Sequence, residues 1–208
     1  MASARDEILG RIRTALRDVE PDAEPVLSPP GARVPEALGL IDHFAERVAD
    51  YRATVVHCAP DGLATAVAAA LPVGSRVVVP AGLPEAVLAG ITHPVRDDGL
   101  TASELDLVDA VVTCARVGIA ETGTIVLDHE PDQGRRAITL VPDLHVCVVR
   151  ADQVVPDVPD AFPLLDPVRP LTWISGPSAT SDIELDRVEG VHGPRHLYVI
   201  VVGSAPSR

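Results

Sequence analysis

Residues 53–80, "ATVVHCAPDGLATAVAAALPVGSRVVVP", decide the fold class of the chain. The β-branched "ATVVHC" predicts a short strand, the alanine-rich "DGLATAVAAAL" predicts a helix that Asp61 would cap, and "SRVVVP" predicts a second strand. Strands that alternate with helices favour a parallel sheet joined by right-handed crossovers. We therefore expect an α/β protein with a mainly parallel sheet flanked by helices.

The flanking sequence continues this alternation and then changes. Residues 35–51 predict a helix with Leu40, Ile41, Phe44 and Val48 on its inner face, residues 83–90 predict a short helix, and residues 106–115 contain another strand. After Arg116 five segments have strand character without long helices between them: "GTIVLD", "RAITLVP", "HVCVVR", "LTWISG" and "HLYVIVVG". A tight turn at "VPDLH" would join two of them, so the second half predicts hairpins or an antiparallel extension of the sheet.

The N-terminal part of the chain has a different character. Residues 3–19 predict an amphipathic helix, and residues 20–35 hold five prolines, which is typical of a linker or an extended arm. We expect an N-terminal helix and proline-rich linker over residues 1–34, followed by one α/β domain over residues 35–208.

Charge and composition exclude several classes of function. The net charge of −13 disfavours general binding to nucleic acid, because an acidic surface repels phosphates. No window approaches the ~20 apolar residues of a membrane span, and the N-terminus lacks the features of a secretory signal, so we expect a cytoplasmic protein. All 17 basic residues are arginine, which excludes lysine Schiff-base chemistry and lysine-bound pyridoxal phosphate.

Cysteine and histidine spacing gives little support for a metal centre. The three cysteines, Cys58, Cys114 and Cys147, are far apart and form no C-x-x-C motif, so reduced buried thiols are the expected state. His192 and His196 are separated by Gly193-Pro194, which disfavours a metal-binding helix face. We expect no cofactor and no metal in this chain.

Residues 118–128, "GIAETGTIVLD", resemble a phosphate-binding P-loop with the lysine missing. In a P-loop the second glycine begins a helix whose N-terminus faces the phosphates, whereas Gly123 precedes the β-branched "TIVLD". The pattern therefore predicts strand, tight turn and strand, and it argues against ATP hydrolysis. What remains is Glu121 in a turn with Thr122, Gly123 and Thr124: a half-buried carboxylate suited to base or nucleophile chemistry, or simply an exposed turn glutamate.

A second candidate segment runs from residue 173 to residue 202. Its turn after Gly176-Pro177 contains Ser178 and Thr180 and ends at Asp182, so hydroxyls and backbone N–H groups there are candidates for binding an anion. The S-x-x-E spacing at residues 181–184 also fits a helix capping box. His192 lies nearby, and either Arg195 or one of the adjacent pair at 135 and 136 is a candidate to neutralise an acidic ligand.

Three stretches together carry a specific resemblance. "GIAETGTIVLD", "RAITLVPDLHVCVV" and "TWISGPSATSDIELDRVEGVHGPRHLYVIVV" closely resemble the lactate utilization protein C family (LutC, also YkgG), whose shared module is the LUD domain. The resemblance implies a fold similar to the ribose-5-phosphate isomerase, glucosamine-6-phosphate deaminase and CoA-transferase group. It also implies a role in oxidising L-lactate to pyruvate beside two partner proteins that carry iron–sulfur clusters.

The residues leave three hypotheses open. In the first, the chain is a non-redox component of a lactate-oxidising complex, and Glu121, Thr122, Thr124, Ser178, Thr180, Asp182 and His192 bind a small acidic metabolite or contact a partner. In the second, Glu121 is an acyl-accepting nucleophile, by analogy with CoA-transferases. In the third, the chain is a scaffold whose glycines and prolines only shape turns.

Overall fold

The computed structural model describes residues 4–17, 39–178 and 193–203. The chain consists of two compact units, residues 1–30 and residues 31–208. In the first unit α1 (Ala4–Ala15) is a helix with no buried residue, and residues 16–17 form a turn after it. None of the helices in the described part of the chain is both long and apolar enough to cross a membrane.

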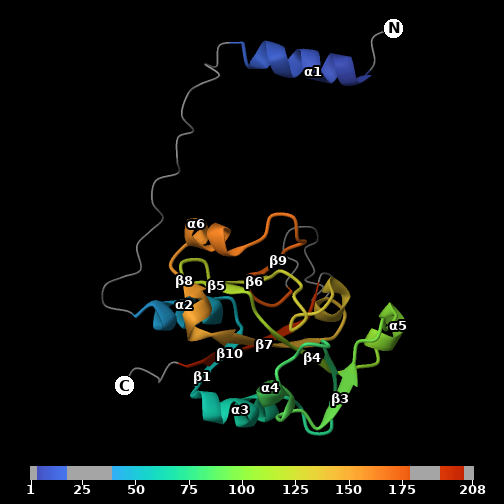
Figure 1. Ribbon diagram of the computed structural model, residues 1–208, viewed down its shortest axis with the longest axis vertical. Helices are drawn as coiled ribbons and strands as arrows, with labels where there is room; N and C mark the ends of the chain where they lie inside the picture. Colours follow the sequence, from blue (N-terminus) through green and yellow to red (C-terminus); the bar gives the residue numbers. More distant parts are fainter. Residues whose placement is uncertain (1–3, 18–38, 179–192, 204–208) are drawn as a thin grey trace, which may run out of the picture. The chain divides into compact units, whose positions relative to one another are not determined.

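A six-stranded sheet of parallel strands is the centre of the second unit (Figure 1). Its strands lie in the order β1 (Thr54–Cys58), β10 (His196–Val202), β7 (Leu144–Arg150), β4 (Ala110–Cys114), β2 (Arg76–Val79) and β3 (His93–Arg96). The strand-helix-strand pattern of residues 53–80 is found as β1, α3 (Leu63–Ala70) and β2. The predicted mainly parallel α/β fold is therefore confirmed.

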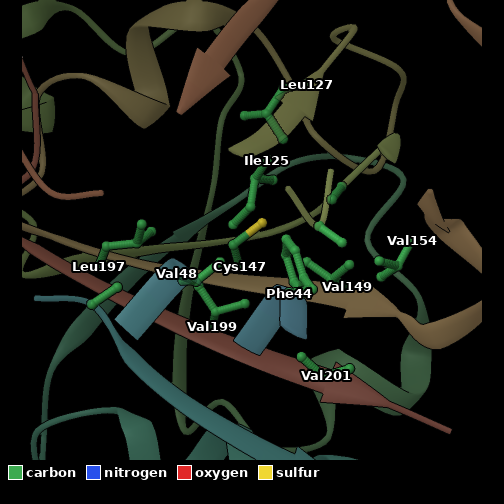
Figure 2. Close-up of a cluster of buried hydrophobic side chains, with 13 residues drawn as sticks. Phe44, Val48, Ile125, Leu127, Cys147, Val149, Val154, Leu197, Val199 and Val201 are labelled. Atoms are coloured by element: carbon green, nitrogen blue, oxygen red, sulfur yellow. The ribbon is translucent and has the colours of Figure 1, made fainter. Parts of the chain in front are cut away.

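Side chains of the neighbouring strands β10 and β7 alternate between two apolar layers. Cys147 and Val149 of β7 and Val199 and Val201 of β10 pack with α2 (Leu40–Asp50), whose Phe44 is fully buried (Figure 2). The intervening side chains, such as Ile200, face the opposite layer, where α3 and α4 (Glu85–Leu88) cover the sheet (Figure 1). Both faces of this sheet are covered, which explains its nearly unbroken valine and isoleucine runs.

Of the strands predicted after Arg116, "GTIVLD" and "LTWISG" lie in a second, smaller sheet, whereas "HVCVVR" and "HLYVIVVG" are the parallel strands β7 and β10 of the first sheet. The order of the second sheet is β8 (Val154–Val155), β5 (Val117–Ile119), β6 (Thr124–Leu127) and β9 (Thr172–Ile174), and β6 is antiparallel to both of its neighbours. Ile125 and Leu127 of β6 pack in the same cluster as Phe44 and Cys147, so this sheet and α2 share one core (Figure 2).

Short helices complete the second unit. They are α5 (Ala102–Leu105), α6 (Val158–Ala161), and the 3₁₀ helices η1 (Pro60–Gly62), η2 (Arg136–Thr139), η3 (Ala151–Gln153) and η4 (Phe162–Leu164). Thr101 and Glu104 form a reciprocal capping box at the start of α5. The capping box predicted at residues 181–184 lies outside the described residues.

Three local predictions were wrong. The segment "RAITLVP" forms η2 rather than a strand, because β7 runs parallel to β4 and the chain must first return to the edge where β4 begins. For the same reason "VPDLH" is no hairpin turn. Asp61 does not cap α3, whose N-cap is Gly62 without a side-chain bond, since the chain enters α3 through η1.

Candidate functional site

The turn between β5 and β6 carries the first candidate residues, and it joins two antiparallel strands as the sequence predicts. At Gly123 the backbone has φ +58°, and a Cβ there would lie 2.6 Å from the carbonyl carbon of Arg47 and 2.8 Å from the backbone nitrogen of Val48. Only glycine combines this conformation with so close an approach. Gly123 therefore lets the turn sit directly on the backbone of α2.

The contact between the turn and α2 brings the Glu121 carboxylate beside the imidazole of His43. Nε2 of His43 lies 3.2 Å from Oε2 of Glu121, and since a carboxylate accepts, the imidazole N–H donates. The His43 side chain is 2% exposed and that of Glu121 is 22% exposed. Nδ1 of His43 is buried and has no hydrogen-bond partner in the described part of the chain. An unmatched buried polar atom costs free energy, so the buried position of His43 carries a cost that the bond to Glu121 offsets only at Nε2.

A chain of hydroxyl groups links this turn to the end of β9. The Thr122 hydroxyl donates to Oγ1 of Thr124 at 2.8 Å, and Oγ1 of Thr124 lies 2.8 Å from Oγ of Ser175. The strand register explains the contact, because Ile125 pairs with Ile174 and so places Thr124 beside Ser175. Gly176, with φ +86°, brings the second turn against Tyr51 just after α2. Both turns therefore meet beside α2.

Ser175 also lines a cavity of about 190 Å³. Its lining comes from η2, β7, β9 and the turns at either side of the undescribed segment 179–192: Arg136, Thr139, Leu140, His145, Thr172, Trp173, Ile174, Ser175, Gly176, Pro177, Ser178, Pro194 and Leu197. The Ser178 N–H donates to the carbonyl of Pro194 at 2.8 Å, which joins the two turns. Burial lowers the pKa of His145 to about 4, so this imidazole is neutral at physiological pH.

A larger cavity of about 630 Å³ borders η2 from another side. Arg135 donates two hydrogen bonds to Asp97 there, and these bonds hold the pKa of the Asp97 carboxyl below its usual value. Arg169 is paired with Glu130. Each of these charges is therefore neutralised by a neighbour within the same cavity, and only Arg136 also borders the smaller one.

Arg195, the candidate from the second segment, also forms an ion pair. Arg195 donates from Nη2 to Asp143 at 2.7 Å, and this pairing lowers the pKa of the Asp143 carboxyl. Arg195 and Arg135 therefore act as structural partners of aspartates, and Arg136 is the remaining one of the three predicted anion-binding candidates.

The cysteines lie within apolar layers. Burial raises the pKa of the Cys114 and Cys147 thiols to about 12, which keeps both protonated and unreactive. Across residues 4–17, 39–178 and 193–203, no group of three or more His, Cys, Asp or Glu side chains is placed to hold a metal ion.

The structure brings together part of the predicted site. Glu121, Thr122, Gly123 and Thr124 share one turn, and Ser178 lies on the cavity beyond Ser175. Thr180, Asp182 and His192 lie outside the described residues. Sequence reasoning missed His43, although its position three residues after Leu40 and next to Phe44 on the inner face of α2 signals burial.

The match to a known protein family covers both candidate turns. A family model described as the LUD domain matches residues 86–202. The chain is 48% identical over 207 residues to a lactate utilization protein C from Deinococcus radiodurans, and the alignment covers 97% of each protein. The chain belongs to the lactate utilization protein C family. The resemblance predicted from the sequence is thereby confirmed.

A second sequence relative and one solved structure are also similar to this LUD-domain protein. A lactate utilization protein C from Bacillus subtilis is 33% identical over 102 residues, which cover 43% of this chain and 41% of the relative. The crystal structure of a DUF162 family protein from Deinococcus radiodurans superposes with a TM-score of 0.67 at 44% identity, covering 79% of this chain and 96% of that one. Glu121 and Arg136 lie within the LUD match, whereas His43 precedes it.

Proposed function

We propose that this LUD-domain protein is a cytoplasmic component of a system that oxidises L-lactate to pyruvate. Its similarity to the lactate utilization protein C of Deinococcus radiodurans along 97% of both chains carries the proposal. In this system separate partner proteins hold the iron–sulfur clusters and transfer the electrons. This chain binds a small acidic ligand, or a partner surface, at the junction of α2 with the turns of β5–β6 and β9.

The chemistry of the junction supports a binding or proton-transfer role rather than a redox role. Glu121 is partly exposed and forms a pair with the buried His43, so a proton can move between a carboxylate and an imidazole at this position. The hydroxyls of Thr124 and Ser175 extend the polar path toward the smaller cavity. The two described cysteines with strongly raised pKa values are protonated, and protonated thiols bind clusters poorly.

Deletion of the gene tests the role in lactate oxidation. We expect the deletion strain to lose growth on L-lactate and to keep growth on pyruvate, because only the oxidation step requires this protein. A pull-down of the full chain from lactate-grown cells, followed by iron analysis and mass spectrometry, should recover iron–sulfur proteins. Normal growth of the deletion strain on L-lactate would refute the proposal.

Glu121→Gln separates a working site from a scaffold. The amide keeps the size of the side chain and an acceptor for His43 but removes the negative charge, so we expect lactate oxidation to fall by about tenfold or more. The melting temperature should stay close to that of the wild type, because the pair is partly exposed. Oxidation is measured as L-lactate consumption by the complemented deletion strain.

Glu46→Gln is the matched control for this change. Glu46 lies on α2, the helix that carries His43, is exposed, and has no ion pair within the described residues. We expect this variant to restore lactate oxidation fully. Full activity in Glu121→Gln as well would show that the turn serves only as structure, as the scaffold hypothesis states.

A further inference from the structure

The smaller cavity has an unbalanced charge. Arg136 is the one ionised side chain among its described lining residues, since the others are apolar, hydroxyl-bearing or glycine, apart from the neutral His145. Arg136 also has no ion pair within residues 4–17, 39–178 and 193–203. Arg136 is exposed, so an acidic ligand in the cavity can reach its guanidinium. The cavity therefore favours a ligand with one negative charge.

The polar groups of the cavity wall fit an oxygen-rich ligand. Oγ of Ser175 lies 2.8 Å from Oγ1 of Thr124, which already accepts the Thr122 proton. The Thr124 hydroxyl also has the Thr122 carbonyl as an acceptor at 3.4 Å, and either hydroxyl can donate between Thr124 and Ser175. When Thr124 donates to Ser175, which is the shorter contact, the Ser175 proton is left for a partner on the cavity side. Trp173, Leu140 and Leu197 supply an apolar wall for the rest of the ligand.

The volume limits the size of this ligand. About 190 Å³ is below the range of roughly 300–1,000 Å³ that is typical of pockets for drug-sized ligands. A nucleotide or a complete coenzyme A would extend beyond this space.

We propose that the cavity bordered by Arg136, His145, Trp173 and Ser175 binds a small monocarboxylate, with Arg136 paired to its carboxylate group. This proposal deepens the proposed function and rests on it in taking L-lactate as the first probe. It also separates two tasks: Arg136 holds the ligand, whereas Glu121 and His43 lie at the opposite end of the hydroxyl chain.

Trp173 provides a direct measurement, because it is the only tryptophan of the chain and it lines the cavity. We expect L-lactate to change its fluorescence in a saturable way in the purified full chain. Lactamide is neutral but has nearly the same shape as L-lactate. It should bind more weakly by about tenfold or more, since a hydrogen-bonded charge is lost. Arg136→Gln should weaken L-lactate binding by a similar factor of about tenfold or more.

Arg96→Gln is the control for the change in net charge. Arg96 is exposed on the edge strand β3 and lines neither of the two cavities at η2, so its loss should leave binding unchanged. Equal affinity for lactamide and L-lactate would overturn the proposal without relying on any variant. So would tighter binding of succinate or inorganic phosphate, or the absence of saturable binding at millimolar L-lactate by both fluorescence and calorimetry. Loss of growth in the deletion strain would leave the proposed function standing in each of these cases.

Discussion

Gly123→Ala should lower the free energy of unfolding by about 3 kcal/mol. A non-glycine residue with positive φ costs about 1–2 kcal/mol, and a methyl group forced against fixed atoms costs about 1–3 kcal/mol more. Both costs apply here, because φ is +58° and the new Cβ would lie 2.6 Å from the carbonyl carbon of Arg47. The neighbouring atoms belong to the backbone of α2, so no side-chain rotation relieves the clash.

Urea unfolding measures this effect, provided that the free energy of unfolding falls with urea at the same slope in the variant and the wild type. A second variant, Gly74→Ala, separates the two causes of the loss. Gly74 has φ +77°, but no heavy atom lies within 4 Å of the position that a Cβ would take, so its substitution should cost about 1–2 kcal/mol for the backbone conformation alone. The difference between the two variants then reports the contact of the turn with α2. Equal losses in both variants would show that the turn and α2 do not touch in solution.

The fold follows from local patterns to a large extent. The strands at residues 54–58, 76–79 and 110–114 were predictable because a buried parallel strand requires a short β-branched run between helices. The edge strand β3 was missed, since its Pro94 removes a donor and is tolerated only where a strand pairs on one side. The segment "RAITLVP" was mistaken for a strand because Ile138 and Ala137 pack against Val78 and Val111 from outside the sheet, and local composition does not distinguish the two arrangements.

The site was predictable only in its loops. Glycines and hydroxyl residues mark the turns at residues 120–124 and 175–178, so Glu121, Thr124 and Ser178 could be named from the sequence. Their partners depend on tertiary contacts between distant segments. His43 is 78 residues from Glu121, and the choice of Arg136 over Arg135 and Arg195 depends on where Asp97 and Asp143 lie.

The second large effect is expected at acidic pH, where His145 should destabilise the fold by about 3 kcal/mol. Burial lowers the pKa of this imidazole from 6.5 to about 4, so below pH 6.5 the unfolded chain binds a proton that the folded chain excludes. The contribution of the neutral His145 to the free energy of unfolding is fully present above pH 6.5 and is lost as the pH falls toward 4. Each pKa unit corresponds to about 1.4 kcal/mol, which gives the stated total.

His145→Gln removes this titration while it keeps a polar partner for the Thr113 hydroxyl, which lies 2.8 Å from Nε2 of His145. We expect the stability difference between neutral pH and about pH 4.5 to shrink by about 2 kcal/mol in this variant. His93→Gln, at an exposed position, should not change that difference. Asp97 and Asp143 have lowered pKa values, so their contributions are lost only below pH 3.8 and do not overlap this window.

An unchanged pH dependence in His145→Gln would mean that His145 gains a proton without unfolding the chain. The cavity would then carry a second positive charge beside Arg136 in acid, and its preference would move from monoanions toward dianions. The titration of His145 therefore tests the charge balance on which the assignment of a monocarboxylate ligand depends. If burial keeps the imidazole neutral, L-lactate binding through Arg136 should stay constant between neutral pH and the onset of acid unfolding.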